Sequence, residues 1–376
     1  MIRKNLLIVA DSEQDANMLY AVKMFVPDPF IYLRIRGRNM IVMSDLEFDR
    51  ARDQAAHCRV ISQTECQQKL RQRGIRRTGF AQVIRLLLRE EGLGQVYVPG
   101  NFPLELANEL FRINIRVKAN PGAFFPEREQ KSAVEVKKIS AALTMAEVGL
   151  AEAIQALKSA KVGRNRRLMY HNAPLTSDKL RAIINTAIIQ ANGLASHTIV
   201  AGGKHGCDPH EQGHGNLHAR EPIILDVFPR SQKTGYFGDI TRTVVKGRAS
   251  EAIRKLYDTV KRGQEIAFAK MHRNARTADV HKAVQSIFRQ EGYKTGKENG
   301  RMQGFFHGTG HGLGLEIHEA PRMGAHSTGV LKAGHVVTVE PGLYYPGLGG
   351  VRLEDVALIT SNGPRNLTQF EKVLEV

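Results

Sequence analysis

The first 120 residues alternate short apolar runs with amphipathic stretches, a pattern typical of strands interleaved with helices. Apolar runs of strand length predict strands at Leu6–Ala10, Phe30–Ile35, Met40–Met43 and Val96–Val98. Apolar residues at helical spacing predict helices at Leu46–Ala56, Phe80–Glu91 and Leu104–Phe111. This part of the chain is therefore predicted to form an α/β domain.

Prolines and a glycine, at Pro121, Gly122 and Pro126, then interrupt the pattern and mark a predicted domain boundary. A long helical pattern follows from Glu127 to about Ala160, and further helices are predicted at 178–191, 251–272 and 278–291. The β-type runs are at 223–228, 236–245, 336–339 and 351–359, and the first two predict a hairpin with a long loop. We predict two domains, residues 1–125 and residues 126–376.

The net charge of the chain is strongly positive. Its 376 residues include 54 Lys and Arg against 37 Asp and Glu, which gives +17 and raises nucleic acid, an anionic surface or an acidic substrate as partners. However, residues 301–376 carry six basic and seven acidic side chains, so the excess lies in earlier helical and loop segments. Most of it is therefore interpreted as surface charge, and nucleic acid is a disfavoured partner.

The cysteines and the N-terminal segment indicate a cellular compartment. Cys58, Cys66 and Cys207 share no CxxC spacing and form no disulfide framework, which favours a reducing environment. The apolar run near the start, Leu6–Ala10, is too short for the core of a signal peptide, and no window has the roughly 18 apolar residues of a membrane span. We predict a soluble, cytoplasmic protein without a membrane partner.

Four carboxylates of the second half lie in apolar, β-type runs, where an unpaired charge would be costly. They are Asp226, Asp239, Glu340 and Glu354, and only Arg242 and Arg352 lie within three positions of any of them. Buried carboxylates need a partner charge, hydrogen bonds or a metal, and four negative charges would balance two divalent cations. Pairing Asp226 with Asp239 across the predicted hairpin would aim both carboxylates at one point.

A glycine- and histidine-rich segment at residues 305–319 adds imidazoles to these carboxylates. It contains His307, His311 and His318, among glycines that let the backbone approach a ligand closely. Oxygen ligands with one imidazole suit Mn²⁺, Co²⁺, Fe²⁺ or Zn²⁺, and no cysteine is placed to add a thiolate. Glu316 and Glu319, in the same segment, are predicted to hold imidazoles in place.

Four motifs, in this order, resemble the Xaa-Pro dipeptidases and Xaa-Pro aminopeptidases of peptidase family M24, the pita-bread metallopeptidases. They are Asp-Ile-Thr-Arg-Thr at 239–243, His-Gly-Thr-Gly-His-Gly-Leu-Gly-Leu-Glu-Ile-His-Glu at 307–319, Thr-Val-Glu-Pro-Gly-Leu-Tyr at 338–344 and Gly-Val-Arg-Leu-Glu-Asp at 350–355. The match covers roughly residues 130–376, and Met-Ser-Asp-Leu-Glu at 43–47 resembles part of the creatinase/prolidase N-terminal domain. The resemblance implies an α/β N-terminal domain, 1–125, followed by an α+β pita-bread catalytic domain, 126–376.

The resemblance also implies roles for individual residues. It implies two divalent metal ions, with Mn²⁺ favoured over Co²⁺, Zn²⁺ or Fe²⁺, and the ligands Asp226, Asp239, His311, Glu340 and Glu354. Three residues would take part in catalysis: Glu340, which would accept the proton of the bridging water, and His210 and His318. The substrate would be contacted by His210, His307, His318 and Arg352.

Two spacings depart from the family pattern. Asp226 and Asp239 are thirteen positions apart rather than the usual eleven, which a longer hairpin loop would absorb. The interval from His210 to Asp226 is one residue shorter than usual, which leaves His214 as the alternative upstream histidine.

The implied function is hydrolysis of the bond between an N-terminal residue and proline, in dipeptides or short peptides, by a metal-bridging hydroxide in a homodimeric enzyme. The alternative is a catalytically silent pita-bread protein that binds nucleic acid or protein partners through its basic surface. Such relatives typically lack the metal ligands, whereas this chain has all five. Bound metal with peptide hydrolysis, against salt-sensitive binding to nucleic acid, distinguishes the two.

Overall fold

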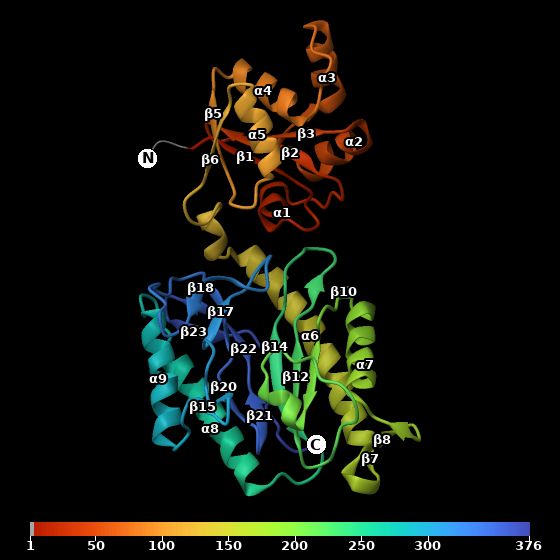
Figure 1. The fold of residues 1–376 in the computed structure, drawn as a ribbon, viewed down its shortest axis with the longest axis vertical. Helices are drawn as coiled ribbons and strands as arrows, with labels where there is room; N and C mark the ends of the chain where they lie inside the picture. Colours follow the sequence, from red (N-terminus) through yellow and green to blue (C-terminus); the bar gives the residue numbers. More distant parts are fainter. Residues whose placement is uncertain (1–3) are drawn as a thin grey trace. The chain divides into compact units, whose positions relative to one another are not determined.

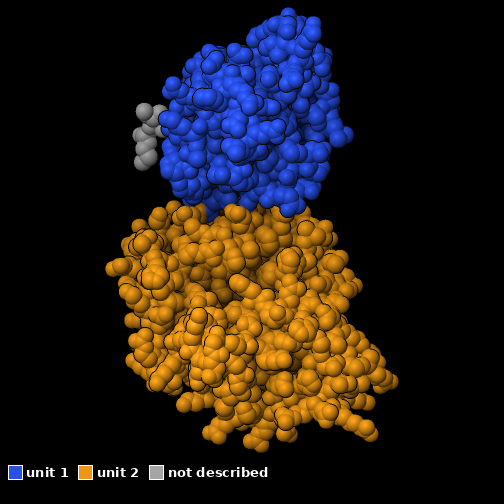
Figure 2. Space-filling model, viewed as in Figure 1, with its two compact units in different colours: residues 1–128 blue, residues 129–376 orange. Residues whose placement is uncertain are grey.

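The computed structural model describes residues 4–376 and divides after Arg128 into two compact units (Figure 2). The division lies at residue 128, where the proline pattern placed it at 125. Within the described part of the chain, no helix has both the length and the apolar character needed to cross a membrane.

Unit 1 is built on one six-stranded mixed sheet with the strand order β4-β3-β2-β1-β5-β6. The strands are β1 (Leu6–Ala10), β2 (Phe30–Ile35), β3 (Arg38–Met43), β4 (Arg59–Ser62), β5 (Gln95–Val98) and β6 (Arg116–Ala119). The helices are α1 (Ala16–Val22), α2 (Asp45–Gln54), α3 (Gln63–Gln72), α4 (Phe80–Glu90) and α5 (Leu104–Arg112). Alternate residues of β1 enter two different apolar clusters, Leu7 and Val9 one and Leu6 and Ile8 the other, so both faces of the sheet are covered.

Unit 2 contains a long helix, α6 (Ala133–Ser159), that packs on α7 (Ser177–Gln190) and on a three-stranded sheet (Figure 1). The order in this sheet is β11-β12-β14, with β11 (Ile199–Gly202), β12 (Pro222–Val227) and β14 (Ile240–Val245). Helix α6 begins six residues after the predicted Glu127, because Ser132 and Glu135 form a capping box there and Pro126–Glu129 is a separate 3₁₀ turn.

A second sheet of unit 2 has the order β18-β17-β19-β22-β23. Its strands are β17 (Gly310–Gly312), β18 (Glu319–Met323), β19 (Val336–Val339), β22 (Asp355–Thr360) and β23 (Gly363–Asn366). Helices α8 (Glu251–Lys270) and α9 (Thr277–Gln290) pack on each other and on strands β19 and β18, respectively. Three two-stranded sheets complete the pairing: β10 (Gly193–Leu194) with β13 (Arg230–Ser231), β15 (Gly296–Glu298) with β16 (Arg301–Gln303), and β20 (Gly342–Tyr345) with β21 (Gly349–Arg352). A small three-stranded sheet consists of β7 (Lys161–Val162), β8 (Leu168–Tyr170) and β9 (Ala173–Pro174).

Two strand predictions were wrong in detail. Asp226 on β12 faces Thr241 on β14, not Asp239, because Asp239 precedes the first residue of β14. Since Asp239 is two residues before Thr241, its side chain still lies on the same face of the hairpin as that of Asp226. The predicted run 351–359 is two strands, because β21 pairs with β20 whereas β22 pairs with β19, and Glu354 lies between them.

Candidate metal centre

Strands β12 and β14 bring the first carboxylates together around one hydroxyl group. Thr241 Oγ1 lies 2.9 Å from Asp226 Oδ1 and 2.8 Å from Glu354 Oε2. The Glu354 backbone N–H also donates to the Thr241 carbonyl, at 3.0 Å, which fixes the segment between β21 and β22 against β14. All three residues are buried, and Thr241 lies within hydrogen-bond distance of both carboxylates.

The remaining candidate ligands reach the same place from the second sheet. Ligand atoms of Asp239, His311 and Glu354 all lie within 4.8 Å of one another. His311 Nε2, on β17, is 3.8 Å from Asp239 Oδ2 and 3.2 Å from Glu340 Oε1, which follows β19. The structure therefore brings all five predicted ligand side chains into one buried cluster.

The His311 ring is oriented by its own backbone neighbour. Its Nδ1 lies 3.1 Å from the Gly312 carbonyl oxygen, an acceptor that requires the proton on Nδ1. Nε2 then faces the carboxylates, where its lone pair would be available to a bound metal ion, the usual arrangement of a metal-binding imidazole. Gly310 is required next to it, because a Cβ there would lie 1.9 Å from the Thr338 carbonyl oxygen.

The cluster carries more negative charge than its protein neighbours compensate. Burial and the neighbouring carboxylate of Glu354 raise the pKa of Asp239 well above its ordinary range. Burial and the carboxylate of Glu340 do the same to the pKa of Glu354. Burial would also raise the pKa of Glu340, but the hydrogen bond and charge of His311 outweigh it and lower that pKa to about 2. Four carboxylates and one imidazole in a buried cluster fit divalent cations, which would neutralise this charge.

A cavity of about 820 Å³ opens onto the cluster. Of the predicted substrate-contacting residues, it is lined by His210, His307, His318 and Arg352. His214 is not among the lining residues; its largely exposed ring stacks on His205, with centroids 4.0 Å apart, and lies 3.5 Å from Glu211. The geometry therefore favours His210 as the upstream histidine.

His307 and Arg352 are tied to neighbouring residues. Arg352 donates to Asp226 Oδ2 at 2.8 Å and to the Tyr344 hydroxyl at 2.9 Å. The Tyr344 hydroxyl lies 2.9 Å from His307 Nε2, and His307 Nδ1 is 2.7 Å from the Gly308 carbonyl oxygen. Both ring nitrogens of His307 therefore have partners, and burial, its largest influence, lowers the pKa of His307 to about 4. This chain of contacts orients Arg352 toward the cluster.

Sequence reasoning missed several residues of the site. Thr241 and Tyr344 lie inside the family motifs, but they contact residues distant in sequence, such as Glu354 and His307, respectively. Arg322 lines the cavity with an exposed guanidinium, four residues after His318. An arginine on β18 gave no signal in the sequence, because exposed arginines are common.

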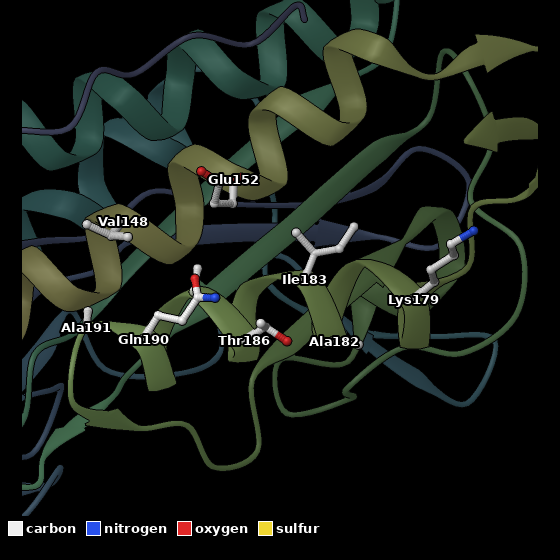
Figure 3. A pocket seen from close by; sticks show the side chains of 9 residues that line it. Val148, Glu152, Lys179, Ala182, Ile183, Thr186, Gln190 and Ala191 are labelled. Carbon is white, nitrogen blue, oxygen red and sulfur yellow. The ribbon is translucent and has the colours of Figure 1, made fainter. Parts of the chain in front are cut away.

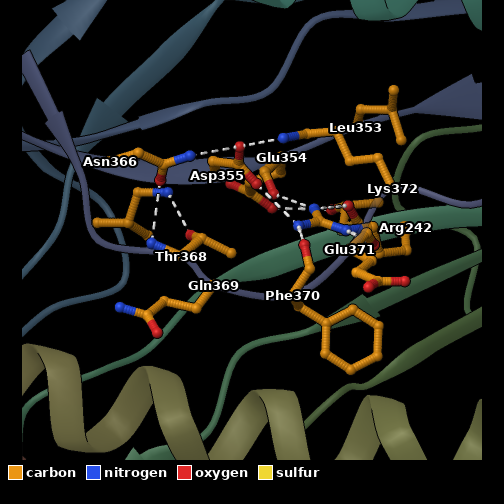
Figure 4. Close-up of polar contacts among 12 residues, drawn as sticks. Arg242, Leu353, Glu354, Asp355, Asn366, Thr368, Gln369, Phe370, Glu371 and Lys372 are labelled. Atoms are coloured by element: carbon orange, nitrogen blue, oxygen red, sulfur yellow. Dashed lines mark hydrogen bonds and ion pairs between the residues drawn. The ribbon is translucent and has the colours of Figure 1, made fainter.

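Behind the cluster, Arg242 binds the segment that carries Glu354 (Figure 4). Its guanidinium donates to Asp355 Oδ1 at 2.9 Å and to the backbone carbonyls of Thr241, Glu354, Phe370 and Glu371. Arg242 is one of the two basic residues close in sequence to the four carboxylates, but it pairs with Asp355, which adjoins Glu354. It therefore fixes the backbone of Glu354 and leaves its carboxylate free to face the cluster.

A second cavity, of about 560 Å³, lies between α6 and α7 (Figure 3). Among the described residues that line it, only Glu152 and Lys179 are ionisable, and the others are mostly small or apolar. This cavity lacks a convergent set of polar groups, so we assign it no chemistry.

The model of metallopeptidase family M24 matches residues 137–361, more than half of the chain. The chain therefore belongs to this family, as the four motifs predicted. It is 36% identical over 191 residues to the Xaa-Pro dipeptidase of Pyrococcus furiosus, which covers 50% of this chain and 52% of that protein. It is 32% identical over 254 residues to an uncharacterized peptidase of Bacillus subtilis, over 62% of this chain and 69% of that protein. The match thus spans about half the length of the Pyrococcus relative.

Solved structures share the fold along nearly the whole chain. An X-Pro aminopeptidase from Thermotoga maritima superposes with a TM-score of 0.82 at 19% identity, covering 99% of this chain and 97% of that one. The prolidase from Pyrococcus furiosus superposes with a TM-score of 0.78 at 23% identity, covering 98% and 97%. The predicted fold class, an α/β domain followed by an α+β pita-bread domain, is confirmed.

Proposed function

We propose that this chain is a dinuclear-metal exopeptidase that hydrolyses the bond between an N-terminal residue and proline in dipeptides or short peptides. The observation that carries the proposal is the convergence of Asp226, Asp239, His311, Glu340 and Glu354 beside a cavity lined with histidines. Membership of family M24 and similarity to an Xaa-Pro dipeptidase support it. Mn²⁺ as the native ion, a homodimeric state and a cytoplasmic location stay predictions.

Two divalent cations held by these five side chains would supply Lewis-acid activation of water and of the scissile carbonyl. The protein groups would then manage protons and charge. The side chain of Glu340 is more exposed than those of Asp239 and Asp226, 19% against 6% and 12%. We propose that it accepts the proton of the attacking water and delivers it to the proline nitrogen, because that tertiary amide nitrogen carries no hydrogen of its own.

The histidines of the cavity would stabilise the developing negative charge. His210 and His318 line the cavity from different segments, and an imidazole N–H can donate to the oxyanion or to the substrate carboxylate. We propose these two as the catalytic and substrate-binding histidines. His307 and Arg352 both contact the Tyr344 hydroxyl, and we propose that they contribute to substrate binding through this tyrosine. Arg322 adds a positive charge to the cavity, which suits a carboxylate close to the scissile bond.

Peptide length separates the two kinds of Xaa-Pro peptidase. In a dipeptide the free carboxylate belongs to the proline itself, whereas in a longer peptide it lies further away. If Arg322 binds that carboxylate, Arg322→Met should reduce kcat/KM for Ala-Pro about tenfold or more and leave Ala-Pro-Ala unchanged. An equal effect on both substrates would rule out this role for Arg322.

The main test combines metal content with hydrolysis. Purified protein should bind about two divalent ions per chain by mass spectrometry and cleave Ala-Pro or Ala-Pro-Ala when Mn²⁺, Co²⁺ or Zn²⁺ is added. Asp226→Ala should lose metal and activity together, whereas Asp258→Ala, an exposed change on α8, should lose neither. Undiminished cleavage by Asp226→Ala would sink the two-metal mechanism, and metal binding without turnover would favour the silent binding protein.

A further inference from the structure

Lys131 and Glu319 form a buried ion pair next to the histidine segment of the site. Lys131 Nζ lies 2.8 Å from Glu319 Oε2, and the two side chains are 1% and 7% exposed. The pair joins the residue just before the cap of α6 to the first residue of β18, 188 positions further along the chain. A buried lysine is rare without a partner, and Glu319 is the partner of this ammonium group within residues 4–376.

Glu319 uses its other oxygen to close a turn. Oε1 accepts the backbone N–H groups of Leu315 and Glu316, at 3.0 and 3.1 Å. The turn has no room for another side chain, because a Cβ at Gly314 would lie 2.6 Å from Glu319 Oε2. Glu319 was predicted to hold an imidazole in place, and in the structure it holds the backbone that leads to one.

This turn connects two histidines of the site. It begins after His311, whose ring is buried in the metal cluster, and ends at His318, whose exposed side chain lines the cavity. The two rings are 4.4 Å apart, nearly perpendicular. Gly312 pairs with Glu319 and the Phe237 N–H donates to the Gly314 carbonyl. These two contacts and the Glu319 carboxylate together fix the turn.

Lys131 is itself anchored to unit 2 through its backbone. Its N–H donates to the Gly334 carbonyl at 2.7 Å, and the preceding Gln130 forms a β-bridge with His335. The ammonium group therefore has a fixed position, and Glu319 is held against it.

We propose that Lys131 is a positioning residue, which through Glu319 fixes the turn at 312–318 and so aims His318 at the substrate. This inference rests on the proposed peptidase function. Without the ammonium group, the Glu319 carboxylate would lose the ion-pair partner of its Oε2 atom, and the loss of a buried partner charge favours uptake of a proton or entry of water into the turn. Either change would loosen the turn and let His318 move.

The first test measures the turn itself, independently of activity. In hydrogen–deuterium exchange, amides of residues 313–318 should exchange about tenfold faster in Lys131→Met than in wild type. The matched control is Lys332→Met, the same substitution at an exposed lysine near His335. Lys131→Arg, which keeps the charge, should recover part of the protection. Unchanged exchange in Lys131→Met, or equal acceleration in the control, would overturn the proposal.

The second test asks whether Lys131 acts through His318. Lys131→Met should lower kcat/KM for Xaa-Pro peptides about tenfold to a hundredfold with metal content unchanged. In a His318→Asn background, the same substitution should cost less than about twofold, because the group it positions is already gone. A full additional loss in that background, or loss of metal, would overturn the proposal. If Lys131→Met does not fold, Glu319→Gln gives the same cycle.

The outcomes also separate this inference from the proposed function. If wild-type protein cleaves no Xaa-Pro peptide, the proposed function fails, while the exchange experiment still decides whether Lys131 holds the turn. If the enzyme is active and the exchange of the turn is insensitive to Lys131, the proposed function stands and the positioning role fails.

Discussion

Arg242 offers a stability prediction whose size follows from its contacts. Its side chain is 2% exposed and pairs with Asp355, which is 1% exposed, at 2.9 Å. Arg242→Met would leave Asp355 without this partner and four backbone carbonyls without a donor. Breaking a buried pair typically costs about 3–5 kcal/mol. Asn366 and Lys372 also contact Asp355, so we expect the lower part of that range.

The measurement is thermal unfolding in a chelator, so that metal binding does not contribute to stability. For a unit of this size, a loss of about 3 kcal/mol corresponds to a fall in Tm of about 6–12 °C. The transition of unit 2 can be identified as the one that added Mn²⁺ raises. Because Arg242 also holds the Glu354 carbonyl, Mn²⁺ affinity should fall about tenfold to a hundredfold.

The control is Arg262→Met on α8, the same substitution in a pair that is more exposed. Arg262 and Glu291 are 54% and 28% exposed, and such surface pairs contribute about 0–1 kcal/mol. If Arg242→Met melts within about 2 °C of wild type, or no lower than Arg262→Met, the buried pair does not stabilise unit 2 as argued.

Three further predictions concern metal, pH and backbone packing. Chelation should lower the Tm of unit 2, and Mn²⁺ at a hundred times its Kd should restore about 2.7 kcal/mol; a Tm insensitive to metal would contradict a metal site in the cluster. Burial, Lys131 and Lys332 lower the pKa of His335 to about 4 from 6.5, so its stabilising effect is complete above pH 6.5 and is lost as the pH falls toward 4. In urea unfolding, the free energy of unfolding of wild type should therefore fall by about 2 kcal/mol more than that of His335→Gln when the pH is lowered from 6.5 to 5. Equal losses would refute the lowered pKa of His335. Gly310→Ala should destabilise unit 2 because its Cβ would meet the Thr338 carbonyl at 1.9 Å, whereas Gly347→Ala, with nothing within 4 Å, should melt like wild type.

The secondary structure could be predicted where one pattern acted alone. The strand at Leu6–Ala10 was found from its uninterrupted apolar run, and the helix from Phe80 from its apolar residues at helical spacing. Prediction failed where a side-chain contact overrides the pattern: α6 begins at the Ser132 cap, and the apolar run around Glu354 breaks into two strands that pair with different neighbours. Such boundaries depend on partners that are distant in sequence.

The residues of the candidate site, too, could be predicted only in part. Carboxylates in apolar runs could be recognised because burying a charge is costly, and the structure brings all four together with His311. Their supporting contacts could not be recognised. Thr241 meets Glu354 across 113 positions, and Lys131 meets Glu319 across 188. Nothing in the local sequence marks an ordinary threonine or lysine as one half of such a contact.

The pairing of the buried lysine and arginine side chains of unit 2 bears on the charge of the carboxylate cluster. Among the described residues, the buried lysine and arginine side chains are Lys131, Arg242 and Arg352. Lys131 pairs with Glu319, next to His318, and Arg242 with Asp355, next to Glu354; only Arg352 pairs with a candidate ligand, Asp226. Four carboxylates against one guanidinium leave more acidic than basic groups in the site, and keeping all of them ionised there is costly without further cations. Lys131 and Arg242 therefore hold the chain around the cluster, and the carboxylates are left as a set of oxygen ligands that suits divalent metal.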